Sequence, residues 1–156
     1  MENKVQHLVL VYPVRTPDDW EQAFSIRKQV FVDEQKVPLE LERDEIDEIA
    51  YHVLGTLGGK IVATGRAFAD PKDSSWARIG RMAVLPIARG KGVASEVLKH
   101  LLNFCKTRGF KKIMLHSQSY VTSLYKSFGF AVVGDPFEDA GIRHVEMILE
   151  IPNKLT

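Results

Sequence analysis

The chain has 156 residues, of which 45% are hydrophobic and 26% are charged, the ordinary composition of a globular protein with one buried core. Its formal net charge of +1 excludes a general electrostatic attraction to nucleic acid or to a membrane surface as its mode of action. No apolar run is long enough to span a bilayer, and Met1–Lys4 do not lead into a signal-peptide pattern, so we expect a cytosolic protein with a single domain over residues 1–156.

The first third of the chain predicts a strand followed by a helix. His7–Tyr12 is rich in β-branched and aromatic residues and stops at a proline, which is typical of a strand. Thr16 is suited to cap a helix, because a proline and two acids follow it and an apolar face continues as far as Phe31. The acidic stretch Val32–Asp47 is broken by a proline and predicts a loop or a short helix.

The middle of the chain predicts a three-stranded meander. Ala50–Thr56 and Lys60–Ala69 have the composition of strands, and Gly58-Gly59 between them is typical of a hairpin turn. Trp76–Leu85 supplies the third strand of this meander.

The last third predicts a helix over Ser95–Arg108, a strand over Lys112–His116 and a short helix over Tyr120–Phe128. Ala131–Val133 and Val145–Ile151 follow as closing strands. The order of elements along the whole chain is β-α-(α)-β-β-β-α-β-α-β-β, which predicts an α/β (α+β) fold with a mixed sheet flanked by helices.

Arg89–Ala94 form a glycine-rich turn between the third meander strand and the helix after it. A turn of this kind directs unpaired N–H groups and the positive end of a helix at an anion. Gly90 and Gly92 keep side chains out of the way, while Arg89 and Lys91 add positive charge. The turn therefore predicts a phosphate or pyrophosphate site, and the alternative is a tight turn without a ligand.

Two better-known phosphate motifs do not fit this turn. A Walker A loop needs glycine at the position of Leu85 and serine or threonine at the position of Gly92. A Rossmann fingerprint needs a third glycine at the position of Ser95, and no strand-helix-strand unit of the dinucleotide-binding kind surrounds this turn. An enzyme that uses ATP or NAD is therefore a disfavoured alternative.

Three segments of the chain, Arg89–Ala94, Met82–Pro86 and Leu124–Phe130, together resemble motifs of the GNAT N-acetyltransferase superfamily. Arg89–Ala94 match its (Gln/Arg)-x-x-Gly-x-(Gly/Ala) signature, and Met82–Pro86 resemble its pantetheine-holding strand. Leu124–Phe130 are similar to its Leu-Tyr-x-x-x-Gly-Phe segment. Arg27–Gln35 and Gly141–Met147 resemble the ElaA-like branch of the superfamily.

The resemblance implies a mixed, mostly antiparallel sheet of about six or seven strands with a splayed central strand pair, and acetyl-CoA as the acyl donor. Backbone N–H groups of the glycine turn would hold the pyrophosphate, and the edge of Met82–Val84 would pair with pantetheine. A backbone N–H near Val84 would polarise the thioester carbonyl. The residues that the resemblance assigns to the cofactor are Met82, Ala83, Val84, Arg89, Gly90, Lys91, Gly92, Val93, Ala94, Gln118 and Tyr125.

Tyr125 is the candidate catalytic acid. Attack of an amine on the thioester expels a CoA thiolate, and a phenol can protonate it because the ordinary pKa values of a thiol and a tyrosine differ by only ~1.5 units. The alternative is a tyrosine that packs in the core beside Leu124 and Phe128. Gln118 stands where relatives carry an asparagine against the CoA arm, with nearby serines as other candidates.

The group that takes the proton of the amine stays open. The candidates are Glu34, Glu42, Asp44, Asp47, His52, His116 and His144. Among these, we expect Glu34 and His116 to contribute to acceptor binding. The acidic run Glu40–Glu48 could attract a cationic amine, but a solvated charged face is the more common outcome for such a run.

Other chemistry finds little support in the sequence. We expect no metal site, because no histidine pair has ligand spacing with supporting residues, and we expect Cys105 to pack in the core. Direct acetyl transfer to a primary amine therefore fits better than an acyl-enzyme. The expected acceptor is a small cationic molecule such as an amino sugar, a polyamine or an aminoglycoside, with a protein N-terminus or lysine as alternatives.

The main alternative function is a non-catalytic acyl-CoA-binding or regulatory module. We expect no nucleic-acid or membrane partner, and the exposed sheet of such a fold could support a homodimer.

Overall fold

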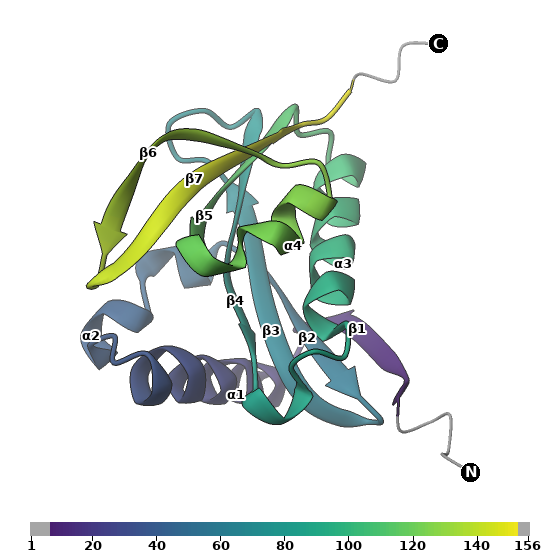
Figure 1. Ribbon diagram of the computed structural model, residues 1–156. Helices are drawn as coiled ribbons and strands as arrows, with labels where there is room; N and C mark the ends of the chain where they lie inside the picture. The colour runs from purple at the N-terminus through teal and green to yellow at the C-terminus, as the bar shows by residue number, and fades with distance from the viewer. Residues whose placement is uncertain (1–6, 153–156) are drawn as a thin grey trace.

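The computed structural model describes residues 7–152, so Met1–Lys4, where we expect no export signal, lie outside the described residues. Its centre is a seven-stranded sheet with the order β1-β2-β3-β4-β5-β7-β6 (Figure 1). Only the β4–β5 pair is parallel among the pairs of this sheet. The expected mixed, mostly antiparallel sheet flanked by helices is confirmed. No helix among residues 7–152 is both long enough and apolar enough to cross a membrane.

Strand β1 (Val9–Pro13) leads into helix α1 (Pro17–Arg27), which continues as the π-helix η2 (Lys28–Glu34). The predicted cap is present as a capping box: the Thr16 hydroxyl accepts a hydrogen bond from the Asp19 N–H at 3.0 Å, and the Asp19 carboxylate accepts one from the Thr16 N–H at 3.3 Å. Strand β1 includes its proline instead of stopping before it, which an edge strand tolerates because one side of its backbone is unpaired.

The acidic stretch folds into two short helices, α2 (Leu39–Glu42) and η3 (Glu45–Glu48). The predicted meander then follows as β2 (Tyr51–Leu57), β3 (Lys60–Ala69) and β4 (Trp76–Val84). Gly58 and Gly59 both have positive φ, 58° and 85°, as a tight two-residue hairpin turn requires.

Helix α3 (Val93–Thr107) follows the short helix η4 (Pro86–Ala88) and covers one face of the sheet, while α1 and η2 lie against the other (Figure 1). The helix approaches closely because two strand residues beneath it are glycines: a Cβ at Gly65 would lie only 3.0 Å from Leu101 Cδ1, and one at Gly55 only 3.0 Å from Val97 Cγ2. Cys105 is buried in this core, as expected.

The C-terminal part consists of β5 (Lys112–Gln118), η5 (Ser119–Val121), α4 (Thr122–Ser127), β6 (Ala131–Asp139) and β7 (Ile142–Glu150). The last two strands form one long hairpin that the sequence analysis shortened to 131–133 and 145–151. A register shift between Val133 and Phe137 explains the error, because a bulge that contains a glycine and a proline interrupts the pattern of a regular strand.

Candidate functional site

The two parallel strands at the centre of the sheet separate partway along their length. Pairing between β4 and β5 runs from Trp76 opposite Lys112 to Ile79 opposite Leu115 and ends there. Beyond Ile79, β4 remains paired with β3 through Val84, but its other edge has no partner strand among residues 7–152. The expected splay is therefore present, and it leaves a free strand edge.

A bulge in β4 helps to open this gap. The register between β3 and β4 shifts between Thr64 and Arg66, and Arg81 on the opposite strand has a φ of 50°. A residue with a long side chain rarely adopts this left-handed conformation, so surrounding contacts must hold Arg81 in place. Its guanidinium is tied to the carbonyl of Glu42 at 3.1 Å and to Asp44 at 3.3 Å.

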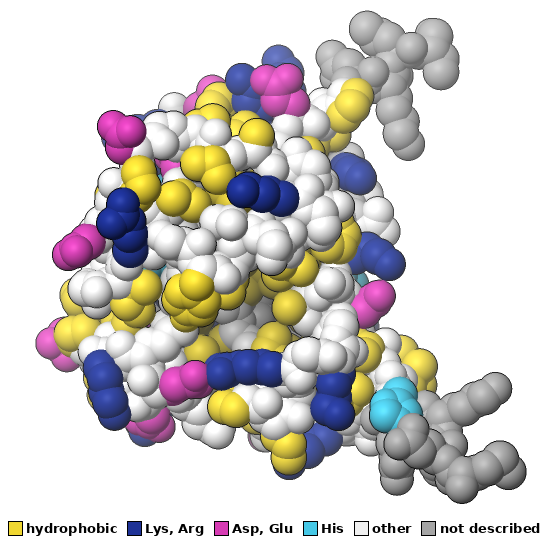
Figure 2. Space-filling view, in the orientation of Figure 1, with side chains coloured by type: hydrophobic (Ala, Val, Ile, Leu, Met, Phe, Trp, Pro, Cys, Tyr) yellow, Lys and Arg dark blue, Asp and Glu magenta, His cyan; other side chains and the backbone are white. Residues whose placement is uncertain are grey.

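The gap opens into a cavity of about 640 Å³. Figure 2 shows hydrophobic side chains around a hollow in the middle of this face, with lysine and arginine side chains along one edge. Nine of the predicted site residues line the cavity: Glu34, Met82, Ala83, Val84, Arg89, Ala94, His116, Gln118 and Tyr125. The other four, Gly90, Lys91, Gly92 and Val93, form the turn that leads into α3 and are not part of the lining.

The glycine turn has the geometry that its sequence predicts. Gly90 and Gly92 have φ of 75° and 82°, and no atom lies within 4 Å of where a Cβ on either would stand. Gly92 is also the N-cap of α3 and lacks a capping side chain. The first N–H groups of the helix therefore lack a side-chain acceptor at the cap, and the positive helix end faces open space.

Arg89 does not project freely from this turn. Its two terminal nitrogens each lie 2.7 Å from the Glu34 carboxylate, and its Nε donates to the Val84 carbonyl at 3.0 Å. The hydrogen bond from Arg89 lowers the pKa of Glu34, so the carboxylate is charged at neutral pH. Sequence reasoning missed this pair because 55 residues separate its members.

Tyr125 lies on α4 and faces β4 across the cavity. Its hydroxyl is 3.8 Å from Met82 Sδ, and its ring meets Phe130 edge-on at 6.1 Å. Burial raises the pKa of Tyr125 to about 12, which is further above an ordinary thiol than the sequence argument assumed. Burial also raises the pKa of a thiol, since it raises that of the Cys105 thiol to about 12. Tyr125 is thus a phenol that keeps its proton at neutral pH.

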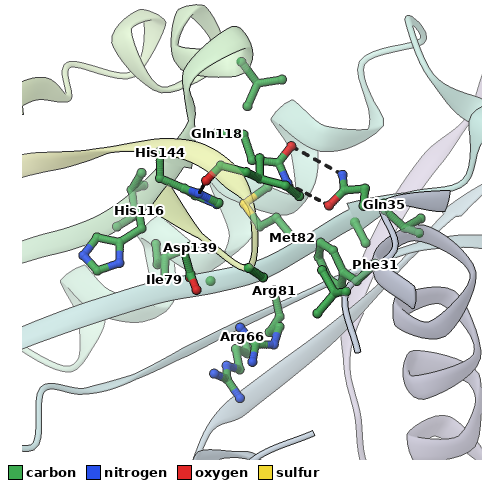
Figure 3. A pocket seen from close by; sticks show the side chains of 18 of the residues that line it. Phe31, Gln35, Arg66, Ile79, Arg81, Met82, His116, Gln118, Asp139 and His144 are labelled. Carbon is green, nitrogen blue, oxygen red and sulfur yellow. Dashed lines mark hydrogen bonds between the residues drawn. The ribbon is translucent and has the colours of Figure 1, made fainter. Parts of the chain in front are cut away.

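Gln118 is engaged by a residue that the sequence analysis did not select. Its Nε2 donates to Gln35 Oε1 at 2.8 Å, and Gln35 Nε2 donates back at 3.4 Å (Figure 3). The Tyr120 hydroxyl also donates to the side-chain amide oxygen of Gln118, Oε1. This amide pair links η2 to the end of β5, so a CoA arm would have to compete with Gln35 for Gln118.

The acidic run is only in part the solvated charged face that we expected. Glu42 and Asp47 are only 3% and 6% exposed, and both bind Arg27, whose Nη1 lies 2.8 Å from Asp47. Arg66 binds Asp47 and Asp44, each at 2.7 Å. The expectation holds for Glu40, Glu45 and Glu48, which are exposed. It was wrong for the other acids of the run, because they are partners for two buried arginines, and a buried cation requires such partners. Arg66 in the middle of an apolar strand was the available signal.

Arginine contacts determine the ionisation of Asp47. Burial alone would raise the pKa of Asp47, but hydrogen bonds and charge from Arg27, together with the charge of Arg66, outweigh it and lower the pKa to about 2. The carboxylate is therefore a fixed part of the core and is a poor proton acceptor for catalysis.

The histidines differ sharply in their surroundings. His52 is buried away from the cavity lining, and burial lowers its pKa to about 4. His116 lines the cavity with Nε2 3.5 Å from Glu146. His144 also lines it, and its Nδ1 lies 2.7 Å from the Ile142 carbonyl. Because a carbonyl only accepts, Nδ1 carries the hydrogen, and Nε2 of neutral His144 presents a lone pair.

Among residues 7–152, no group of three or more histidine, cysteine, aspartate or glutamate side chains has the arrangement of a metal site.

The chain matches a family model over residues 15–151, described as an acetyltransferase (GNAT) domain. It is 33% identical to the uncharacterised N-acetyltransferase YjcF of Bacillus subtilis over 86% of this chain and 94% of that protein. It is 30% identical to the protein ElaA of Escherichia coli over 81% of this chain and 84% of that protein. The crystal structure of Escherichia coli ElaA superposes with a TM-score of 0.82 at 26% identity, covering 92% of this chain and all of that one.

Proposed function

Because the chain belongs to the GNAT acetyltransferase family, in its ElaA-like branch, we propose that it transfers the acetyl group of acetyl-CoA directly to a primary amine of a small molecule. The observation that carries this proposal is the free edge of β4 beyond Ile79. This edge runs along a cavity that begins near the glycine turn and is bordered by Tyr125.

The donor would bind along β4. The turn Arg89–Ala94 would hold the pyrophosphate with its N–H groups, and the edge of Met82–Val84 would pair with the amides of pantetheine as an added strand does. This arrangement brings the thioester into the cavity beside Tyr125, where a backbone N–H near Val84 would polarise the thioester carbonyl. Gly90 and Gly92 support this proposal because the space above them is open.

The chemistry needs two proton transfers. The neutral amine attacks the acetyl carbon, the carbon–sulfur bond breaks, and the CoA thiolate takes the proton of the Tyr125 hydroxyl. The nitrogen of the new amide gives up one proton, and His144 Nε2 is the acceptor that the structure best supports, because Nδ1 is already bound to a carbonyl. Tyr125 then regains a proton from solvent, and His144 releases its proton to solvent. Both side chains are thereby restored to their starting states.

A calorimetric titration with acetyl-CoA tests the donor site. Gly92→Trp fills the turn and should abolish binding. Gly109→Trp is a matched control, because Gly109 also has positive φ (79°) and open space around it but stands after the other end of α3. No binding to the folded wild type, or equal loss in both variants, would overturn the donor site.

A second measurement separates an enzyme from a non-catalytic module. Free thiol released from acetyl-CoA is measured across a panel of amines. Release that depends on both the amine and Tyr125 supports the enzyme, whereas tight acetyl-CoA binding without release across the panel supports a binding or regulatory module.

A further inference from the structure

Gly80 on β4 marks an open space surrounded by arginines. It lies opposite Arg66 in the β3–β4 register, two residues after Arg78 and directly before Arg81. No atom lies within 4 Å of where a Cβ on Gly80 would stand. All four residues line the cavity, and Figure 3 shows Arg66 and Arg81 at the same end of it.

These arginines have hydrogen-bond donors to spare. Arg66 is only 4% exposed, yet its Nε has no hydrogen-bond partner among the described residues. Arg78 is bound to Asp70 through Nε at 2.7 Å, and within residues 7–152 neither of its terminal nitrogens has a hydrogen bond. The terminal nitrogens of Arg78 and Arg81 that lack a partner are therefore available to donate to an oxygen atom placed above Gly80.

The neighbouring carboxylates are already committed. Glu42 is held by Arg27 and faces Arg81 at 3.9 Å, and Asp44 is held by Arg66 at 2.7 Å. Of the remaining carboxylates that line the cavity among residues 7–152, Glu34 is paired with Arg89 and Asp139 is exposed at the end of β6. Glu42, the carboxylate of the acidic run that lines the cavity, therefore has little charge left to attract a cationic amine.

The charges around Arg81 also favour an anionic group at this end of the cavity. Burial, followed by repulsion from Arg66 and Arg27, lowers the pKa of Arg81, although Asp44 and Glu42 partly compensate. The Arg81 guanidinium donates hydrogen bonds to the backbone carbonyls of Glu42 and Leu41 and to the Asp44 carboxylate, and these bonds hold the bulged residue in place. The guanidinium thus has a fixed position in a region where further negative charge is favourable.

We propose that the acceptor amine also carries a carboxylate, and that this carboxylate binds above Gly80 to the free terminal nitrogens of Arg78 and Arg81. This inference rests on the proposed function, which it narrows to amino-acid-like acceptors. Gly80 and Met82, beside which the thioester would lie, are two residues apart, so even a fully extended chain would separate them by no more than roughly 7 Å. We therefore expect the carboxylate and the amine of the acceptor to lie within roughly 7 Å of each other.

Product analogues test the site without requiring turnover. The probes are the N-acetyl derivatives of alanine, leucine, phenylalanine and glutamate, each compared with the matching carboxamide by calorimetric titration of the protein with and without CoA. In at least one pair we expect the acid to bind ten-fold or more tightly than its carboxamide. If no acid binds better than its carboxamide, including the case in which neither binds, the proposal is overturned.

Substitutions at Gly80 and at Arg78 test where the carboxylate binds. Gly80→Leu should remove the difference between acid and carboxamide by filling the space, and Gly80→Ala should reduce it less. Arg78→Gln should weaken binding of the acid about five-fold or more, whereas Arg108→Gln, an exposed arginine after α3, should leave it unchanged. A preference for the acid that survives Gly80→Leu in a folded protein places the carboxylate elsewhere and contradicts the assignment.

The acetyl-CoA titration separates this inference from the proposed function. If acetyl-CoA fails to bind, the donor site is wrong, and the comparison on the protein without CoA still decides whether a carboxylate binds above Gly80. If acetyl-CoA binds but no acid is preferred, the donor site stands and the acceptor assignment is wrong.

Discussion

The Arg89 guanidinium and the Glu34 carboxylate form a two-point ion pair that joins the glycine turn to η2, with both nitrogen–oxygen distances at 2.7 Å. The two side chains are 42% and 41% exposed, so the pair is screened and contributes about 0.2–1 kcal/mol. A phosphate at the turn would compete with Glu34 for the guanidinium. Glu34 thus acts on the donor site, and its expected contact with the acceptor stays a prediction.

Glu34→Gln should therefore tighten acetyl-CoA binding about 1.4- to five-fold, the range that about 0.2–1 kcal/mol allows. Isothermal titration at two salt concentrations measures the change, and the gain should shrink at high salt. Glu48→Gln removes the same charge from an exposed position on η3 and should leave the Kd unchanged. Weaker binding by Glu34→Gln would show instead that the ion pair orders the turn.

Tyr125→Phe should lower kcat about a hundred-fold or more, the usual contribution of a general acid, while acetyl-CoA affinity changes little. The ring stays in place against Phe130, and only the hydroxyl near Met82 Sδ is lost. Because the pKa of Tyr125 is raised to about 12, its titration should cause no loss of rate below about pH 11. Steady-state rates and a pH profile measure both effects.

Tyr120→Phe is the matched control for that substitution. Tyr120 is 72% exposed and donates to Gln118, so the loss of its hydroxyl should leave kcat close to that of the wild type. Equal losses of kcat in the two variants would remove the special role of Tyr125.

His144→Gln should lower kcat/KM about a hundred-fold near neutral pH, because the amine then loses its proton acceptor. The loss should diminish at high pH, where the free amine is abundant and hydroxide can take the proton. His116→Gln serves as the comparison, since His116 Nε2 already faces Glu146 at 3.5 Å. A large loss in His116→Gln with full activity in His144→Gln would reverse the assignment.

Local patterns predicted the elements of the fold well where a short segment determines its own structure. The Thr16–Asp19 capping box and the Gly58-Gly59 hairpin depend on neighbours a few residues away, and both formed as expected. The glycine turn belongs to the same class, because positive φ at Gly90 and Gly92 follows from the residues themselves.

The contacts between distant segments could not be predicted in this way. The Arg27–Asp47 and Arg66–Asp44 pairs join residues 20 and 22 positions apart, and the charge pattern of the acidic run alone suggested a solvated surface. The bulge at Arg81 is equally invisible, because a non-glycine residue gives no local reason for a φ of 50°. These two features contribute to the arginine-lined end of the cavity, which the sequence analysis therefore did not identify.

His52 should make the stability of the protein fall in mild acid. Burial lowers its pKa from 6.5 to about 4, so the unfolded chain takes up a proton at a higher pH than the folded protein does. The contribution of His52 is complete above pH 6.5, and about 3 kcal/mol is lost as the pH falls to about 4. The depressed pKa of Asp47, about 2 against 3.8, acts later: its contribution is complete above pH 3.8 and is lost as the pH falls through 2.

Urea unfolding at pH 7.5, 5.5 and 4 measures the first of these losses. His52→Gln should be less stable than the wild type at pH 7.5, because the buried ring that packs at a tilt against Trp20 is gone, but its stability should change much less between pH 7.5 and pH 4. His7→Gln, outside the buried core, should keep the full dependence of the wild type. If His52→Gln lost stability as steeply as the wild type over that range, the mild-acid loss would have to come from another group.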